Sequence, residues 1–149
     1  GMASIMNMVP GMNQLKGVDL DGNEKMMDRV EAMLRTTYWG ADLPRSVMEE
    51  AAAHSLCFGV YLDGRQVGYA RAVTDYTTVY YLCDLVIDTA YRGQGLGKAL
   101  VAYITGGDGF DRMQGLLDTR DAHGLYAAFG FRPDAELMMK HRERPLGDG

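Results

Sequence analysis

Apolar side chains in the first third of the chain recur every three or four residues, a spacing that predicts helices. The first such stretch covers residues 24–36, and Asp21 three positions before Glu24 resembles a capping box that would begin the helix. Pro44 suits the first turn of a second helix, which runs to about His54. The pattern therefore begins with two amphipathic helices.

Strand-like patterns follow these helices. Residues 55–62 and 66–74 are apolar runs, and Asp63-Gly64 between them is a strong signal for a two-residue hairpin turn. Residues 79–88 form a third run, which is longer and more apolar. The sequence thus predicts a hairpin followed by a long buried strand.

The last third of the chain alternates between helix-like and strand-like patterns. Helical spacing resumes at Leu96 and ends at Gly106-Gly107, because glycine is typical of a helix end. Residues 114–119 read as a short strand, Asp121 as the cap of a short helix, and residues 135–141 as a last strand. The order α-α-β-β-β-α-β-α-β predicts a mixed α/β fold, with one mixed sheet and helices on both faces.

The chain shows no repeat, linker or internal boundary, so we expect one domain. Residues 1–20 read as a loose lead-in that holds at most one short edge strand, and Gly1 before Met2 resembles a remnant of an expression tag. Residues 21–141 form the predicted domain, and residues 142–149 form a polar tail.

Composition narrows the class of protein. The 149 residues are 47% hydrophobic and 23% charged, which is ordinary for a globular domain. A net charge of −5 argues against a general nucleic-acid binder. No apolar run is long enough to span a membrane and no signal peptide is recognisable, so we expect a cytoplasmic protein. Two cysteines, Cys57 and Cys83, are too few for a zinc site, so we expect free thiols and no metal.

Glycine is the compositional outlier, with 19 residues. Three of the glycines alternate at the junction between the long strand and the following helix, in the run Tyr91-Arg92-Gly93-Gln94-Gly95-Leu96-Gly97-Lys98. Residues without a Cβ let a ligand approach the backbone, and a helix start presents free N–H groups and a positive dipole end. The junction therefore predicts an anion site, most naturally one for phosphate.

Three kinds of phosphate-binding loop compete for this site. A P-loop fails because Ala99 replaces the Ser or Thr that holds magnesium, and a dinucleotide fingerprint fails because Lys98 replaces its last glycine. The form Arg/Gln-x-x-Gly-x-Gly/Ala is matched in full by residues 92–97. A nucleotide-phosphate binder stays as a weaker alternative.

Two segments of the chain resemble signatures of one family. Residues 84–100 look like the acyl-CoA-binding motif of the GNAT superfamily of N-acetyltransferases, and residues 122–131 resemble its second signature, a Leu-Tyr helix followed by an aromatic-Gly-Phe turn. The resemblance implies a mostly antiparallel central sheet. That sheet is splayed between the strands at 79–88 and 114–119, the fourth and fifth if a lead-in strand is counted.

The resemblance also implies a co-substrate, acetyl-CoA. In the family the pyrophosphate lies on backbone amides of the glycine loop, and the pantetheine arm pairs with the end of the long strand. Carried onto this sequence, the cofactor-binding residues are Leu85, Val86, Ile87, Arg92, Gly93, Gln94, Gly95, Leu96, Gly97 and Lys98.

The family chemistry needs two proton transfers. Tyr126 matches the tyrosine that protonates the departing CoA sulfur, and Asp84 lies where several relatives carry the base that deprotonates the amine. His123 or a water chain is the alternative base. Simple alternation puts Asp84 on one face with Tyr80 and Leu82, whereas a bulge would reverse its side.

The implied function is direct acetyl transfer to an amine, either a small molecule or a peptide. Tyr38, Trp39 and Tyr76 either wall an amine pocket or cap the core. The alternative is a catalytically silent acyl-CoA-binding sensor, for which Thr119 leaves room because it replaces an Asn common in the family. We expect neither nucleic acid nor membrane as a partner, and a homodimer stays open.

Overall fold

The computed structural model describes residues 3–8, 20–107 and 109–147, with residues 20–23 as backbone only, and it is built around a five-stranded mixed sheet. The strands lie side by side in chain order: β1 (Ser4–Met8), β2 (Leu56–Leu62), β3 (Arg65–Thr74), β4 (Val79–Ile87) and β5 (Gln114–Leu116). The first three pairings are antiparallel and the last is parallel. The predicted mixed, mostly antiparallel sheet is therefore confirmed.

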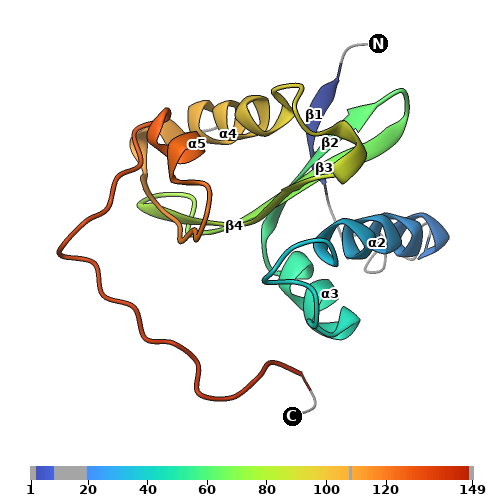
Figure 1. Ribbon diagram of the computed structural model, residues 1–149, viewed down its shortest axis with the longest axis horizontal. Helices are drawn as coiled ribbons and strands as arrows, with labels where there is room; N and C mark the ends of the chain where they lie inside the picture. Colours follow the sequence, from blue (N-terminus) through green and yellow to red (C-terminus); the bar gives the residue numbers. More distant parts are fainter. Residues whose placement is uncertain (1–2, 9–19, 108, 148–149) are drawn as a thin grey trace.

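Helices cover both faces of the sheet (Figure 1). One face carries α2 (Leu20–Leu34) and α3 (Arg45–Ala53), and the other carries α4 (Leu96–Gly106) and α5 (His123–Ala127). Two 3-10 turns, Thr89–Tyr91 and Phe110–Arg112, flank α4. Each face has its own hydrophobic core. Among the described residues, no helix is long and apolar enough to cross a membrane.

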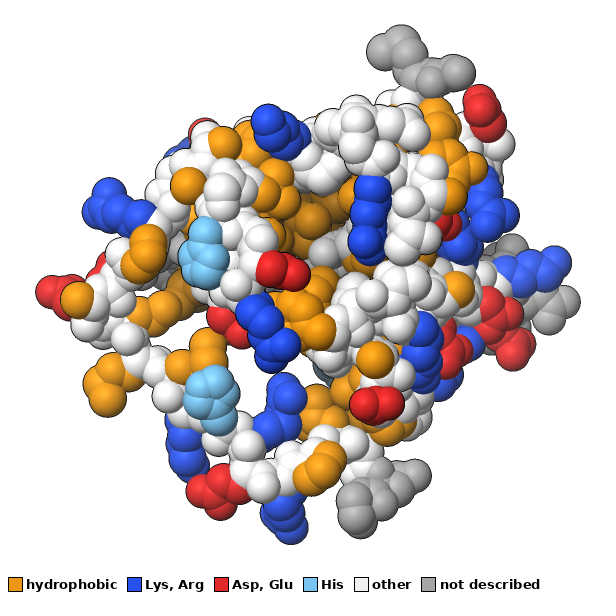
Figure 2. All heavy atoms as spheres, in the orientation of Figure 1, with side chains coloured by type: hydrophobic (Ala, Val, Ile, Leu, Met, Phe, Trp, Pro, Cys, Tyr) orange, Lys and Arg blue, Asp and Glu red, His pale blue; other side chains and the backbone are white. Residues whose placement is uncertain are grey.

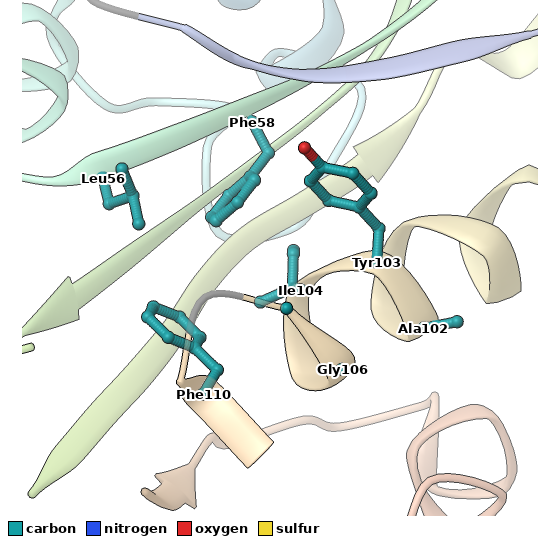
Figure 3. A pocket seen from close by; sticks show the side chains of 8 residues that line it. Leu56, Phe58, Ala102, Tyr103, Ile104, Gly106 and Phe110 are labelled. Carbon is teal, nitrogen blue, oxygen red and sulfur yellow. The ribbon is translucent and has the colours of Figure 1, made fainter. Parts of the chain in front are cut away.

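A small apolar cavity of about 360 Å³ lies between β2 and the end of α4 that is remote from the glycine loop (Figure 3). Phe58 from β2 meets Tyr103 from α4 edge to face, with ring centroids 6.1 Å apart. Ile104 and Phe110 complete the wall. The Tyr103 hydroxyl is the one polar side-chain group in this lining, so the cavity is a packing feature of the α4 core.

The hairpin turn predicted at Asp63-Gly64 is present in the structure. Asp63 and Gly64 have φ angles of +51° and +78°, the left-handed pair that a tight hairpin requires. β2 and β3 run directly into this turn, with Leu62 opposite Arg65.

Two irregularities of β4 shape the rest of the molecule. Tyr69 lies opposite Val86 but Arg71 lies opposite Cys83, so β4 holds one extra residue, and Asp84 within this bulge has a φ of +56°. On its other side β4 pairs with β5 only from Val79 to Tyr81. Beyond that point the two strands separate, as the family resemblance implied.

The first helix and the cap of α5 differ from expectation. α2 begins at Leu20, four residues before the predicted start, and the side chain of Asp21 lies outside the described residues. Asp121 does not cap α5. The backbone N–H of Ala122 instead donates to the Thr119 hydroxyl oxygen, at 3.0 Å. The residue before α5 is thus Ala122, and no side chain caps the helix.

The end of the chain contains the larger error. β5 stops at Leu116 rather than at residue 119, and the predicted last strand over residues 135–141 is wrong. Those residues are exposed, the first two of them lie in a turn, and none pairs with a strand among the described residues. A strand needs a neighbour to accept its backbone hydrogen bonds, and this stretch lies beside none.

Candidate active site

A cleft of about 950 Å³ opens where β4 and β5 separate. The bulged half of β4, the glycine loop, the start of α4, α5 and the loop after α2 all contribute to its walls. Most of the predicted site residues line it. These are Asp84, Leu85, Val86, Ile87, Arg92, Gly93, Gly95, Leu96, Gly97 and Tyr126. Gln94 and Lys98 are exposed beside it without forming its wall.

The segment before the glycine loop is tied to its surroundings by Asp88. One oxygen of this carboxylate accepts the N–H of Ala90 at 2.9 Å, and the other forms an ion pair with Arg29 of α2. Arg29 and the Ala90 N–H hold the pKa of Asp88 below its usual range. Arg29 also donates to the carbonyl of Gln66 at 2.7 Å. The loop is therefore fixed relative to α2 and β3 before it reaches the cleft.

The glycine loop presents bare backbone. Gly93 and Gly95 have φ angles of +83° and +80°, a conformation that other residues rarely adopt, and a Cβ at either position would meet no atom within 4 Å. Gly95 is the residue immediately before α4, so the free N–H groups of the first turn lie beside it. Arg92 closes the loop onto β4, because its Nε donates to the carbonyl of Ile87 at 3.0 Å. This geometry suits an anion.

Tyr126 lies on α5 and lines the cleft. Its side chain is 9% exposed, and its ring meets Phe131 edge to face with centroids 6.0 Å apart. Burial, with smaller contributions from Tyr38 and Asp121, raises its pKa to about 12. Within the described part of the chain its hydroxyl makes no hydrogen bond. The phenol is therefore neutral at physiological pH and its proton is available to a group bound in the cleft.

Asp84 meets a cation that the sequence did not reveal. Its carboxylate accepts from Nε of Arg71 at 2.6 Å, and the two side chains are only 13% and 19% exposed. Arg71 also donates to the hydroxyl of Ser55 at 3.3 Å. Simple alternation would have placed Asp84 with Tyr80 and Leu82, which pack against α4. The bulge turns it to the other face, beside α2 and α3.

The far end of the cleft is aromatic and polar. Tyr38 and Trp39 line it, as one of the two sequence hypotheses required, whereas Tyr76 is 65% exposed and lies outside it. The guanidinium of Arg120 lies 4.2 Å from the ring centroid of Tyr38, and the Arg120 N–H donates to the Tyr38 hydroxyl at 3.2 Å. These contacts fix the aromatic wall.

Tyr81, Asp118 and Arg71 are site residues that sequence reasoning missed. The Tyr81 hydroxyl donates to the carboxylate of Asp118, which closes the cleft just after β5. Polar residues inside a strand were a weak signal of a functional site, because buried strands rarely contain them. Their partners could not be named before the strands were placed. His123, the alternative base, is exposed and does not line the cleft.

Cys83 is the cleft thiol, and burial raises its pKa to about 11. Because the thiolate is the reactive form, alkylation of Cys83 by iodoacetamide should be slow at pH 7.5 and should accelerate about tenfold for each pH unit up to about 11. Mass spectrometry of the modified peptide measures this rate. Cys57 is buried and its pKa is also raised, so a Cys57→Ser variant should give the same profile. Rapid labelling at neutral pH would contradict this account.

The sequence profile of the acetyltransferase (GNAT) family matches residues 25–131. This stretch is most of the chain, and it contains both the splayed strands and every residue that lines the cleft except Arg142. The chain belongs to the GNAT family. Two signatures that suggested the resemblance, the glycine loop and the α5 segment, lie within the matched region.

Solved structures agree with this membership. A GNAT-family protein from Xanthomonas campestris pv. campestris is 35% identical, with a TM-score of 0.73 over 95% of this chain and 96% of that one. An aminoglycoside N-acetyltransferase, AAC(6')-Iy, was crystallised with CoA. It shares the fold at a TM-score of 0.67 and 15% identity, over 96% of each chain.

Curated relatives are matched over part of their length. A Gibberella zeae protein whose name assigns it as an acetyltransferase is 28% identical over 63% of this chain and 66% of its own length. The chloroplastic GCN5-related N-acetyltransferase 2 of Arabidopsis thaliana is 35% identical over 49% of this chain and 30% of its own length. The chain therefore spans two-thirds or less of either relative.

Proposed function

We propose that this protein is a cytoplasmic N-acetyltransferase that moves the acetyl group of acetyl-CoA directly to an amine acceptor, with no covalent enzyme intermediate and no metal. One observation carries the proposal. A single cleft joins a bare glycine loop at a helix start to a neutral buried phenol, along a strand that has lost its neighbour. GNAT membership supplies the reaction class.

The residues of the cleft fit the co-substrate. Backbone N–H groups around Gly93, Gly95 and Gly97 would hold the pyrophosphate, helped by the α4 dipole. The backbone of Leu85–Ile87 lies on the side of β4 that β5 has left, where the amide of the pantetheine arm would pair with it. A backbone N–H there would also stabilise the oxyanion formed during attack.

Two side chains would handle the protons. Tyr126 would donate to the departing thiolate, because a phenol with a pKa of about 12 keeps its proton at neutral pH. Asp84 would accept a proton from the ammonium form of the acceptor, directly or through water, so that the neutral amine can attack, while Arg71 holds the carboxylate in place. Cys83 is a weak nucleophile because of its raised pKa, which favours direct transfer over an acyl-cysteine route.

The base assignment has its own test. Asp84→Asn can still accept from Arg71 but not take a proton, so kcat/KM for acetyl transfer should fall about fivefold. This fall in kcat/KM is smaller than the one expected on removing a base with both oxygens free, because Arg71 binds one oxygen of Asp84. The matched control is His123→Ala, which removes an exposed side chain outside the cleft and should leave kcat/KM unchanged. The reverse ranking would make His123 the base.

The activity itself is tested by thiol release. Acetyl-CoA is incubated with the protein and a panel of amines, both small molecules and peptides, and free CoA is measured. Turnover with at least one amine supports the proposed acetyltransferase activity. Tight acetyl-CoA binding without turnover on any amine would support the silent sensor instead. In this protein Thr119 uses its hydroxyl to receive the Ala122 N–H, which keeps that alternative worth testing.

A further inference from the structure

Arg71 and Asp84 form a largely buried ion pair in the wall of the cleft. Nε of Arg71 lies 2.6 Å from Oδ2 of Asp84, and the two side chains are 19% and 13% exposed. The second oxygen of Asp84 and Nη2 of Arg71 make no hydrogen bond with any described residue, although both side chains line the cleft. A ligand in the cleft can therefore meet a free acceptor and a free donor side by side.

The proposed reaction leaves this ion pair incomplete. Asp84 becomes neutral when it takes a proton from the acceptor, and Arg71 then remains as a cation that is only 19% exposed. A largely buried charge that loses its partner is strongly destabilising. The reaction therefore favours an acceptor that brings a second anion to Arg71.

No other anion in the part of the chain that the structure describes can replace Asp84 beside Arg71. Arg71 also donates to the neutral hydroxyl of Ser55, and the other titratable groups that act on it are Cys83 and Tyr69. Burial raises the pKa of Cys83 to about 11 and the pKa of Tyr69 well above its usual value, so both groups are neutral at physiological pH. The anion that keeps Arg71 paired is then one that the acceptor carries.

The contact between the two side chains limits how far apart the charges of such an acceptor lie. An amine on Asp84 and a carboxylate on Arg71 are near neighbours, because only 2.6 Å separates the two protein atoms. In an α-amino acid a single carbon separates the amine from the carboxylate. Such an acceptor also brings no net charge to the ion pair, whereas a simple alkylammonium adds an unbalanced positive charge beside Arg71.

The surroundings of the ion pair suit an acceptor with charges of both signs and an apolar side chain. On the face shown in Figure 2, acidic, basic and hydrophobic side chains lie next to one another between α5 and α3. Tyr38 and Trp39 line the cleft, are 46% and 39% exposed, and meet edge to face with ring centroids 5.0 Å apart. Exposed aromatic rings in a cleft favour an apolar ligand group.

We propose that the acceptor is an α-amino acid with an apolar side chain, whose carboxylate binds Arg71 and whose amine binds Asp84. The inference rests on the proposed acetyl transfer. The nitrogen of the amino acid forms a bond to the acetyl carbon, and the carbon–sulfur bond breaks. One proton of the ammonium passes to Asp84 and then to water, and a second replaces, through water, the proton that Tyr126 gives to the sulfur. The products are an N-acetyl amino acid and CoA.

Isothermal titration in the presence of CoA measures acceptor binding without turnover, because CoA has no acetyl group to transfer. The probes are phenylalanine, leucine, methionine and tryptophan, each compared with its amide, which keeps the amine and side chain but is uncharged in place of the carboxylate. At about pH 6.5 both amines are protonated. At least one acid should bind about 30-fold more tightly than its amide. Equal or tighter binding of the amides, or no binding of any of the four amino acids, would overturn the proposal.

Arginine variants locate the carboxylate. Arg71→Gln keeps a donor for Asp84 but removes the charge, so the preference for acid over amide should fall to about twofold or less. Arg71→Lys restores the charge and should recover most of the preference. The matched control is Arg142→Gln, which removes another cation that lines the cleft and should leave the preference unchanged. A preference that survives Arg71→Gln, or that disappears in Arg142→Gln, would refute Arg71 as the partner. Circular dichroism checks the fold, and the comparison of acid with amide in the unmodified protein stands by itself if a variant is unfolded.

Thiol release from acetyl-CoA with the same probes separates this inference from the proposed function. Turnover on amines that have no carboxylate, with none on the four amino acids, would refute the amino-acid acceptor and leave the acetyltransferase activity standing. Binding of an amino acid beside CoA with no thiol release on any amine would refute acetyl transfer and leave an amino-acid site in a silent sensor. Faster turnover of an acid than of its amide supports both proposals.

Discussion

Replacing Gly95 by valine is expected to raise the dissociation constant for acetyl-CoA at least tenfold, which is about 1.4 kcal/mol. The φ of +80° at this position disfavours a branched side chain, and the new atoms would fill space that is open in front of the loop backbone. Isothermal titration measures the change. Because the glycine sits on the surface, the fold should persist, which circular dichroism checks.

The matched control separates backbone strain from loss of the anion site. Gly64 has nearly the same φ, +78°, and also faces open space, but it lies in the β2–β3 hairpin away from the cleft. Gly64→Val should therefore cost comparable stability and leave acetyl-CoA affinity unchanged. Equal affinities for the Gly95 and Gly64 variants would remove the loop from the binding site.

Local patterns predicted the elements whose determinants are themselves local. The Asp63-Gly64 turn requires two left-handed residues, and its sequence supplies them. The glycine loop could likewise be predicted from local sequence, because alternate glycines at a strand-to-helix junction are typical of a phosphate-binding loop. The helical spacing of Leu96, Leu100, Tyr103 and Ile104 predicted α4; Leu100 and Ile104 are buried, whereas Tyr103 is 42% exposed.

Features that depend on two distant segments could not be read in advance. The pairing of Arg71 with Asp84 requires the bulge in β4, and nothing in a single sequence gives the register of two strands. The aromatic wall likewise depends on Arg120, which reaches Tyr38 from 82 positions away. The family motifs thus predicted residues that line the cleft, and the electrostatic partners of these residues could not be predicted.

The predicted strand over residues 135–141 fails for a related reason. Leu137, Met138 and Met139 give it an apolar centre, but a strand is defined by its neighbour, and within the described residues this stretch pairs with no strand. The residue types of this stretch therefore indicated a strand that the chain does not form. They carried no information on whether another strand lies beside it.

The largest catalytic effect is expected at Tyr126. Tyr126→Phe keeps the ring and its edge-to-face contact with Phe131 but removes the proton that the thiolate would take. Acetyl-CoA affinity should change little, whereas kcat and kcat/KM should fall together by about 10²-fold, as for an interaction made mainly in the transition state. Steady-state kinetics with an amine found by the thiol-release panel gives both constants.

The dependence of the rate on the leaving group tests whether the Tyr126→Phe variant is slow because it lacks the phenol proton. An acyl donor whose thiol has a lower pKa needs less help to depart, so the ratio of wild-type to Tyr126→Phe rates should shrink with that donor. Because burial raises the Tyr126 pKa to about 12, the wild-type phenol should also keep its proton throughout an assay range of about pH 7 to 10, and any alkaline fall in rate there must come from another group. A Phe variant with wild-type turnover, measured where chemistry limits the rate, would return Tyr126 to a packing role, because its ring contact alone would then explain its position between α5 and the sheet.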